Sequence, residues 1–96
     1  RDNPMSVEVN SHVYAGTLSV DDTTAEALTS TVRDVSDLLI QAASANTAAI
    51  LVGSSASQTV ELEAGDTLRI QIKDVSKVYV VAASGTQSAN WIATGD

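Results

Sequence analysis

The side chains available for a hydrophobic core are small. The 96-residue chain has no Phe, one Trp and two Tyr, whereas Ser, Thr, Ala and Val supply half of its residues. A core of small aliphatic side chains buries less apolar area per residue than one that contains aromatic rings. A chain of this length has room for one core. The sequence therefore predicts a single small domain that self-associates or is only marginally stable as a monomer.

Acidic residues outnumber basic ones. Twelve Asp and Glu oppose five Lys and Arg, so the formal net charge is −7. This charge repels phosphate backbones and anionic lipid surfaces, so we expect neither nucleic acid nor a membrane as partner. The longest apolar runs are far shorter than the ~20 residues that span a bilayer. The absence of Cys excludes disulfides, thiolate metal ligands and a Cys nucleophile.

Strand-like segments are clearest in the C-terminal half. Residues 50–52 are rich in β-forming side chains, and the small residues that follow at 53–57 are typical of a loop. Residues 59–63 and 67–73 alternate polar and apolar side chains around a short turn at Gly65. This pattern predicts a β-hairpin with Leu68, Ile70 and Ile72 on its buried face and a positive φ at Gly65.

The last third of the chain predicts two more strands. Residues 78–83 are apolar at almost every position, as in a central strand covered on both faces. Residues 84–88 are typical of a turn, and residues 89–94 form a last short strand. This strand contains Trp91, the largest apolar side chain of the protein, which we expect in the core or in an interface.

The N-terminal half is ambiguous. Apolar and polar residues alternate in two short segments before Asp21, which predicts two strands. Between residues 23 and 44, apolar residues recur at steps of four and three, the spacing of an amphipathic helix. The many Ser and Thr residues there are weak helix formers, and the compact run 38–42 suits a strand equally well. Periodicity leaves both structures open for this segment.

A family resemblance favours the strand. Residues 23–28, 37–44, 48–53, 60–68 and 76–85 follow one another in an order and spacing that resemble small virion-associated β-domain proteins of tailed phages, of the head-decoration and head-fibre accessory type. The resemblance begins near residue 23 and continues to residue 95. Glu61 and Glu63 make one segment more acidic than the family pattern, and residues 1–20 have no counterpart in it.

The resemblance implies an all-β fold, an antiparallel β-sandwich or flattened barrel of about six to eight short strands. Residues 37–43 are then a strand, and residues 23–36 are irregular, with at most one helical turn. We expect residues 1–19 to be an N-terminal arm or the first strands, and residues 20–96 to be the β-sandwich domain.

Catalytic and metal-binding patterns are weak. His12 is the only histidine, and no Gly-x-Ser-x-Gly elbow accompanies it, so we expect no enzyme. Asp21, Asp22, Glu61 and Glu63 could supply oxygen ligands to Ca²⁺, but their spacing does not match an EF-hand. The sequence therefore predicts no catalytic residue, no metal ligand and no cofactor. The basic residues Arg69, Lys73 and Lys77 are expected on a solvated face or in ion pairs with Glu61 and Glu63 across the hairpin.

The resemblance implies a structural virion protein that decorates or cements a phage capsid by protein–protein contacts. The expected partners are the major capsid protein or other virion subunits and further copies of the chain, and the expected location is the capsid surface. The alternative is a carbohydrate-binding or host-attachment β module of a fibre or tail tip, although such modules present more aromatic side chains. Alternating valines in the arm could add a strand to a neighbouring sheet edge. The candidate partner contacts are Val7, Val9, Val13 and Tyr14.

Overall fold

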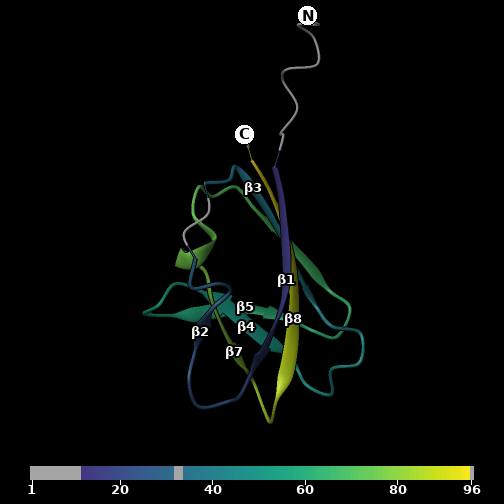
Figure 1. Cartoon of the computed structure of the whole chain (residues 1–96). Coiled ribbons are helices and arrows are strands. Elements are labelled where there is room, and N and C mark those ends of the chain that lie inside the picture. Colours follow the sequence, from purple (N-terminus) through teal and green to yellow (C-terminus); the bar gives the residue numbers. More distant parts are fainter. Residues whose placement is uncertain (1–11, 32–33, 96) are drawn as a thin grey trace, which may run out of the picture.

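The computed structural model describes residues 12–31 and 34–95, where eight strands form two four-stranded antiparallel sheets (Figure 1). The predicted antiparallel β-sandwich is therefore confirmed. Sheet A contains, in spatial order, β1 (His12–Val20), β8 (Gln87–Gly95), β3 (Asp37–Ala42) and β6 (Thr67–Ile70). Sheet B contains β2 (Glu26–Ala27), β7 (Tyr79–Ala82), β4 (Ile50–Gly53) and β5 (Gln58–Leu62). A short 3₁₀ helix, η2 (Val75–Lys77), precedes β7.

The strands pair as one long antiparallel ribbon. β1 pairs with β8, β2 with β7, β3 with β6, and β4 with β5. The loop between β4 and β5 is the end of this ribbon, and the pairing of β3 with β8 and of β4 with β7 rolls the ribbon into two sheets. This strand order is that of an eight-stranded jelly roll.

Side chains of both sheets meet in one core. Along β8, fully buried residues alternate with residues that retain exposure, so every second side chain faces sheet B. Trp91 is one of the inward residues and is only 8% exposed, which confirms the predicted core position. The buried cluster consists of Val20, Leu28, Val35, Leu38, Ile40, Ala42, Ile50, Val52, Leu62, Val75, Val78, Val80, Ala82, Ala89, Trp91 and Ala93.

The predicted hairpin of residues 59–73 is wrong. β5 pairs with β4 in sheet B and β6 pairs with β3 in sheet A, so the turn between them carries the chain from one sheet to the other. The alternation itself is real, because Leu68, Ile70 and Ile72 pack against the core. Arg69 consequently faces Leu39 across the β3–β6 ladder rather than a glutamate across a hairpin.

The other predicted elements agree more closely. Residues 37–43 are predicted as a strand and form β3, and Gly65 has φ 87°, as the turn requires. The region 23–36 is irregular in its described part apart from the two residues of β2 and an isolated bridge between Asp34 and Asp74. Two strands are predicted before Asp21; of this segment, residues 12–20 form the single strand β1, and residues 1–11 lie outside the described part of the chain.

The central strand of residues 78–83 is observed as β7, between β2 and β4. One of its faces is buried and the other is half-buried, so the predicted cover on both sides is incomplete. The last strand, β8, is longer than predicted because it begins at Gln87, inside the predicted turn.

Candidate functional site

The outer face of sheet A, turned away from sheet B, carries the most distinctive surface of the described residues. Side chains alternate along each strand, so the register between neighbouring strands arranges the outward side chains in rows across the sheet. The outer face of sheet A consists of Val13, Ala15, Thr17 and Ser19 from β1, Ser88, Asn90, Ile92 and Thr94 from β8, Asp37, Leu39 and Gln41 from β3, and Thr67 and Arg69 from β6.

The centre of this face is apolar. Leu39 and Ile92 are direct cross-strand partners and retain 39% and 43% exposure. Ala15 continues the row on β1, and Val13, at the rim of the same face, is 65% exposed. These aliphatic side chains lie outside the core and are in contact with water. Surfaces of this kind are commonly covered when a protein associates with a partner.

Two shallow depressions flank this apolar centre. One, of ≈ 220 Å³, is lined by Leu39, Gln41, Thr67, Asn90, Trp91 and Ile92. The other, of ≈ 200 Å³, is lined by Asp37, Leu38, Leu39, Arg69, Ile92 and Thr94. Leu39 and Ile92 line both depressions, so their side chains form a ridge between the two.

A polar row runs beside the apolar row. Thr17 Oγ1 donates a hydrogen bond to Asn90 Oδ1 over 2.8 Å, and Asn90 Nδ2 donates to Gln41 Oε1 over 3.4 Å. Thr67 faces Gln41 in the next strand. These cross-strand contacts hold three neutral polar side chains in fixed positions at the border of the apolar centre.

Formal charge is nearly absent from this face. β1 and β8 contain no Asp, Glu, Lys or Arg, and Asp37 and Arg69 are the only such residues in the strands of sheet A. In a protein with net charge −7, this face can approach another anionic subunit with little repulsion. Depletion of charge around an apolar centre is typical of protein interfaces.

Several acidic side chains instead hold turns. Asp21 Oδ1 accepts hydrogen bonds from Thr24 N over 2.9 Å and from Thr23 N and Thr23 Oγ1 over 3.0 Å each. These bonds, with the Thr24 amide contributing most, hold the pKa of Asp21 below its ordinary value. Asp22 accepts from the Gly85 amide over 3.1 Å, which ties the β1–β2 connection to the β7–β8 turn.

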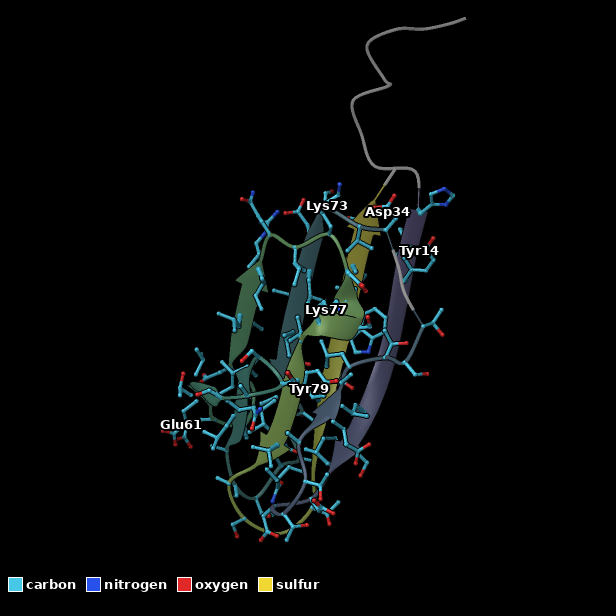
Figure 2. The ribbon with its side chains drawn as sticks, turned by 90° about the vertical axis from the view of Figure 1, so that its left-hand side faces the viewer. Tyr14, Asp34, Glu61, Lys73, Lys77 and Tyr79 are labelled. Carbon is cyan, nitrogen blue, oxygen red and sulfur yellow. The ribbon has the colours of Figure 1, made fainter. Side chains whose placement is uncertain are left out.

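The side chains of Glu61, in β5, and of Glu63, just after the end of that strand, lie close together. Hydrogen bonding with Glu61 and repulsion from its charge raise the pKa of Glu63. Both residues are exposed. Glu61 belongs to β5 of sheet B, and Figure 2 shows it on the opposite side of the molecule from Tyr14. In the described residues, no group of three or more His, Cys, Asp or Glu side chains is arranged to hold a metal ion.

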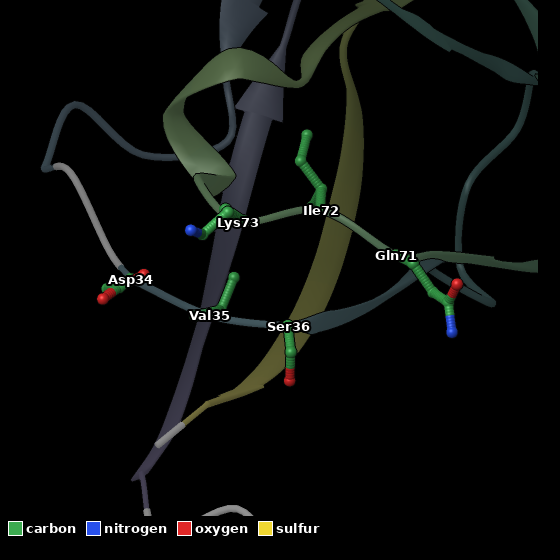
Figure 3. A pocket seen from close by; sticks show the side chains of 6 residues that line it. All are labelled: Asp34, Val35, Ser36, Gln71, Ile72 and Lys73. Carbon is green, nitrogen blue, oxygen red and sulfur yellow. The ribbon is translucent and has the colours of Figure 1, made fainter.

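A cleft of ≈ 560 Å³ lies where the chain enters β3 and leaves β6. Figure 3 shows that its polar side chains diverge: Ser36 and Gln71 point to one side, whereas Lys73 and Asp34 point to another. Val35 and Ile72 point away from Ser36, toward the core. A nucleophile, a base and a donor do not converge here, so the cleft lacks the geometry of an acid–base site.

The residues selected from the sequence occupy different positions. Val13 lies on the outer face of sheet A, whereas Tyr14 packs against the core and stacks on the exposed His12 ring, with centroids 6.2 Å apart. Val7 and Val9 lie outside the described residues. The sequence pattern does not single out Leu39 and Ile92 as contacts, although each is an apolar residue between two inward apolar neighbours, which breaks the alternation of an ordinary two-faced strand.

Neither the comparison with models of protein families nor the search of curated proteins finds a match to this chain. Among the described residues, no helix has the length and apolarity needed to cross a membrane.

Proposed function

We propose that this chain is a structural virion protein, a small accessory subunit that decorates or cements a phage capsid through the outer face of sheet A. The observation that supports the proposal is the exposed Leu39–Ile92 ridge on an almost uncharged face of a jelly roll. Jelly rolls occur in viral capsid proteins and in lectins, so the fold is compatible with a capsid accessory subunit and with a carbohydrate-binding module. The choice between these two functions therefore depends on the chemistry of the exposed surface.

The chemistry of the face suits a protein partner. Leu39 and Ile92 offer apolar area to be buried, and the row Thr17–Asn90–Gln41 offers hydroxyl and amide groups for a polar rim. Attachment through such a surface depends on apolar burial more than on charge, so we expect it to persist as salt is raised.

The size of the face argues for many copies. The four strands of sheet A lie about 4.8 Å apart and have nine, nine, six and four residues at about 3.3 Å each, so the face covers roughly 450 Å². This area is below the roughly 800 Å² that each partner contributes to a standard interface. A single subunit would therefore hold weakly. Association of several subunits, each with its own contact, raises the overall affinity without any new type of contact.

The second candidate is a carbohydrate-binding or host-attachment module. It is favoured by the amides of Asn90 and Gln41, which line the ≈ 220 Å³ depression and could hydrogen-bond sugar hydroxyls. Against it, Trp91 lines this depression but is only 8% exposed because it packs in the core, so the described part of this face offers little aromatic surface on which a glycan could stack.

Co-sedimentation with purified capsids of the phage that encodes the chain tests the proposal. Ile92→Lys places a charge at the centre of the face, and Thr59→Lys places the same charge on an exposed position of β5 in sheet B. We expect Ile92→Lys to weaken capsid binding at least about tenfold and Thr59→Lys to leave it unchanged. Equal binding by both variants, or retention of the wild type on a glycan column that Asn90→Ala abolishes, would contradict the proposal.

A further inference from the structure

We propose that β1 pairs antiparallel with β1 of a second copy of this chain, which joins two copies of sheet A into one eight-stranded sheet. β1 pairs with β8 on one side and is the outermost strand of sheet A on the other (Figure 2). The inference deepens the self-association in the proposed function, but it does not depend on a capsid.

The edge strands of the two sheets are β1, β6, β2 and β5, and they differ in the features that oppose pairing with a strand of another chain. β2 has two residues, one of them Glu26. β5 carries Glu61 and a register shift opposite Gly53, and β6 has four residues that include Arg69. Short length, charge and irregular register are the devices by which proteins prevent edge-to-edge association.

β1 has none of these devices. It runs for nine residues, from His12 to Val20, and stays in continuous register with β8. The strand contains no Asp, Glu, Lys, Arg or Pro. Long, uncharged and regular edge strands pair readily with another strand, so a strand that retains all three properties is suited to a partner.

The sequence of β1 is complementary to itself in one register. When two copies pair antiparallel around Gly16, Tyr14 lies opposite Leu18 of the second copy, and Ala15 lies opposite Thr17. Tyr14 and Leu18 both face the core and are half-buried, so each pair adds apolar contact between the two cores. Ser19 lies opposite Val13, an aliphatic side chain that is 65% exposed in the single chain.

The charge distribution of β1 permits pairing between two copies of this acidic chain. Each copy carries a net charge of −7, yet no acidic side chain of β1 meets its counterpart across this seam.

The pairing also places two outer faces of sheet A side by side in one surface. The resulting face has about twice the area of one copy and two Leu39–Ile92 ridges, which supplies the avidity that a single face lacks.

Single-cysteine variants test the register directly, because the chain has no cysteine of its own. In the proposed pairing, residue 13 lies opposite residue 19 of the second copy, whereas the two copies of residue 13 are about 20 Å apart. We expect an oxidised mixture of Val13→Cys and Ser19→Cys chains to form a disulfide-linked heterodimer. Each variant alone should remain largely uncrosslinked, since a disulfide requires Cα atoms within about 7 Å.

Sedimentation of the whole chain without capsids gives the second readout. We expect a dimer, and we expect the double variant Val13→Lys/Ser19→Lys to raise its dissociation constant at least about tenfold, while Thr59→Lys has no effect. A monomeric wild type, or crosslinking no greater in the mixture than in the separate variants, would overturn the pairing. A dimer that fails to bind capsids would leave the pairing intact and contradict only the capsid function.

Discussion

Gly16 lies directly opposite Trp91 in the β1–β8 ladder, and the indole occupies the space that a side chain at Gly16 would need. A Cβ atom placed on Gly16 would lie 3.0 Å from Trp91 Nε1 and 3.2 Å from two ring carbons. The only tryptophan of the protein therefore packs in the core because its cross-strand neighbour has no side chain. This pairing is one reason why a chain without Phe can fill the space between two sheets.

We expect Gly16→Val to destabilise the fold by about 1–3 kcal/mol, because the valine displaces the indole from its packed position. Ala15→Val, one residue away on the outward side of β1, is the control, and its β-branched side chain should be tolerated. Denaturant unfolding followed by Trp91 fluorescence measures both variants. Equal unfolding midpoints for the two variants would show that the indole is not confined by Gly16.

The turn at Gly65 gives a second prediction. Its φ of 87° lies in the region that favours glycine, and nothing lies within 4 Å of an added Cβ, so a side chain here meets backbone strain rather than a clash. We expect Gly65→Val to cost about 1–3 kcal/mol and Gly65→Asn to cost less, because Asn tolerates positive φ better. Calorimetric melting of the three proteins checks this order. A Val variant as stable as the wild type would show that the turn relaxes to negative φ.

Asp21 gives a pH-dependent prediction. Its pKa is held below the ordinary value of 3.8 by hydrogen bonds from Thr24 and Thr23, so the folded state binds this proton more weakly than the unfolded state. The resulting stabilisation is complete above about pH 5 and is lost as the pH falls through the lowered pKa. We expect the melting temperature of Asp21→Asn to fall less between pH 5 and about pH 2 than that of the wild type. Parallel curves for the two proteins would contradict this assignment.

Glu61 and Glu63 give a prediction of the opposite sign. The pKa of Glu63 is raised above 4.5 by hydrogen bonding with Glu61 and by its charge, so the protonated form is favoured in the folded state. This contribution to stability is present below the ordinary pKa and is lost as the pH rises through the raised one. Glu61→Gln should therefore melt above the wild type at neutral pH, with the difference shrinking below about pH 4. Glu26→Gln removes one exposed charge elsewhere, and an equal gain from it would assign the effect to net charge alone.

Individual strands could be predicted from the sequence because they depend on local alternation. The alternation predicts that Leu68, Ile70 and Ile72 share one buried face, and they pack against the core although β6 pairs with β3 rather than with β5. In a jelly roll only β4 and β5 are neighbours both in sequence and in a sheet. A turn that connects two sheets has the same Gly-Asp chemistry as a hairpin turn, so local pattern does not distinguish them.

Burial of polar groups could not be predicted either. Gln87 falls in a segment with turn-like composition, yet its side chain is only 4% exposed. Its Oε1 accepts a hydrogen bond from the Thr47 amide over 2.9 Å, and its Nε2 donates to the Ser84 carbonyl over 2.8 Å. A partner forty residues away compensates the burial, and no local pattern identifies such a partner. The Leu39–Ile92 ridge could not be predicted for the same reason, because the two residues become neighbours only when β3 and β8 pair.

A density map of intact phage particles that contain this chain would be the sharpest test of the proposed capsid function. We expect density for a small jelly roll on the capsid surface, with the outer face of sheet A against a capsid subunit and Leu39 and Ile92 within the contact. We also expect the β1 strands of neighbouring copies to lie side by side. Density for this domain only at a fibre or tail tip, or on the capsid with Leu39 and Ile92 facing solvent, would refute the proposed function.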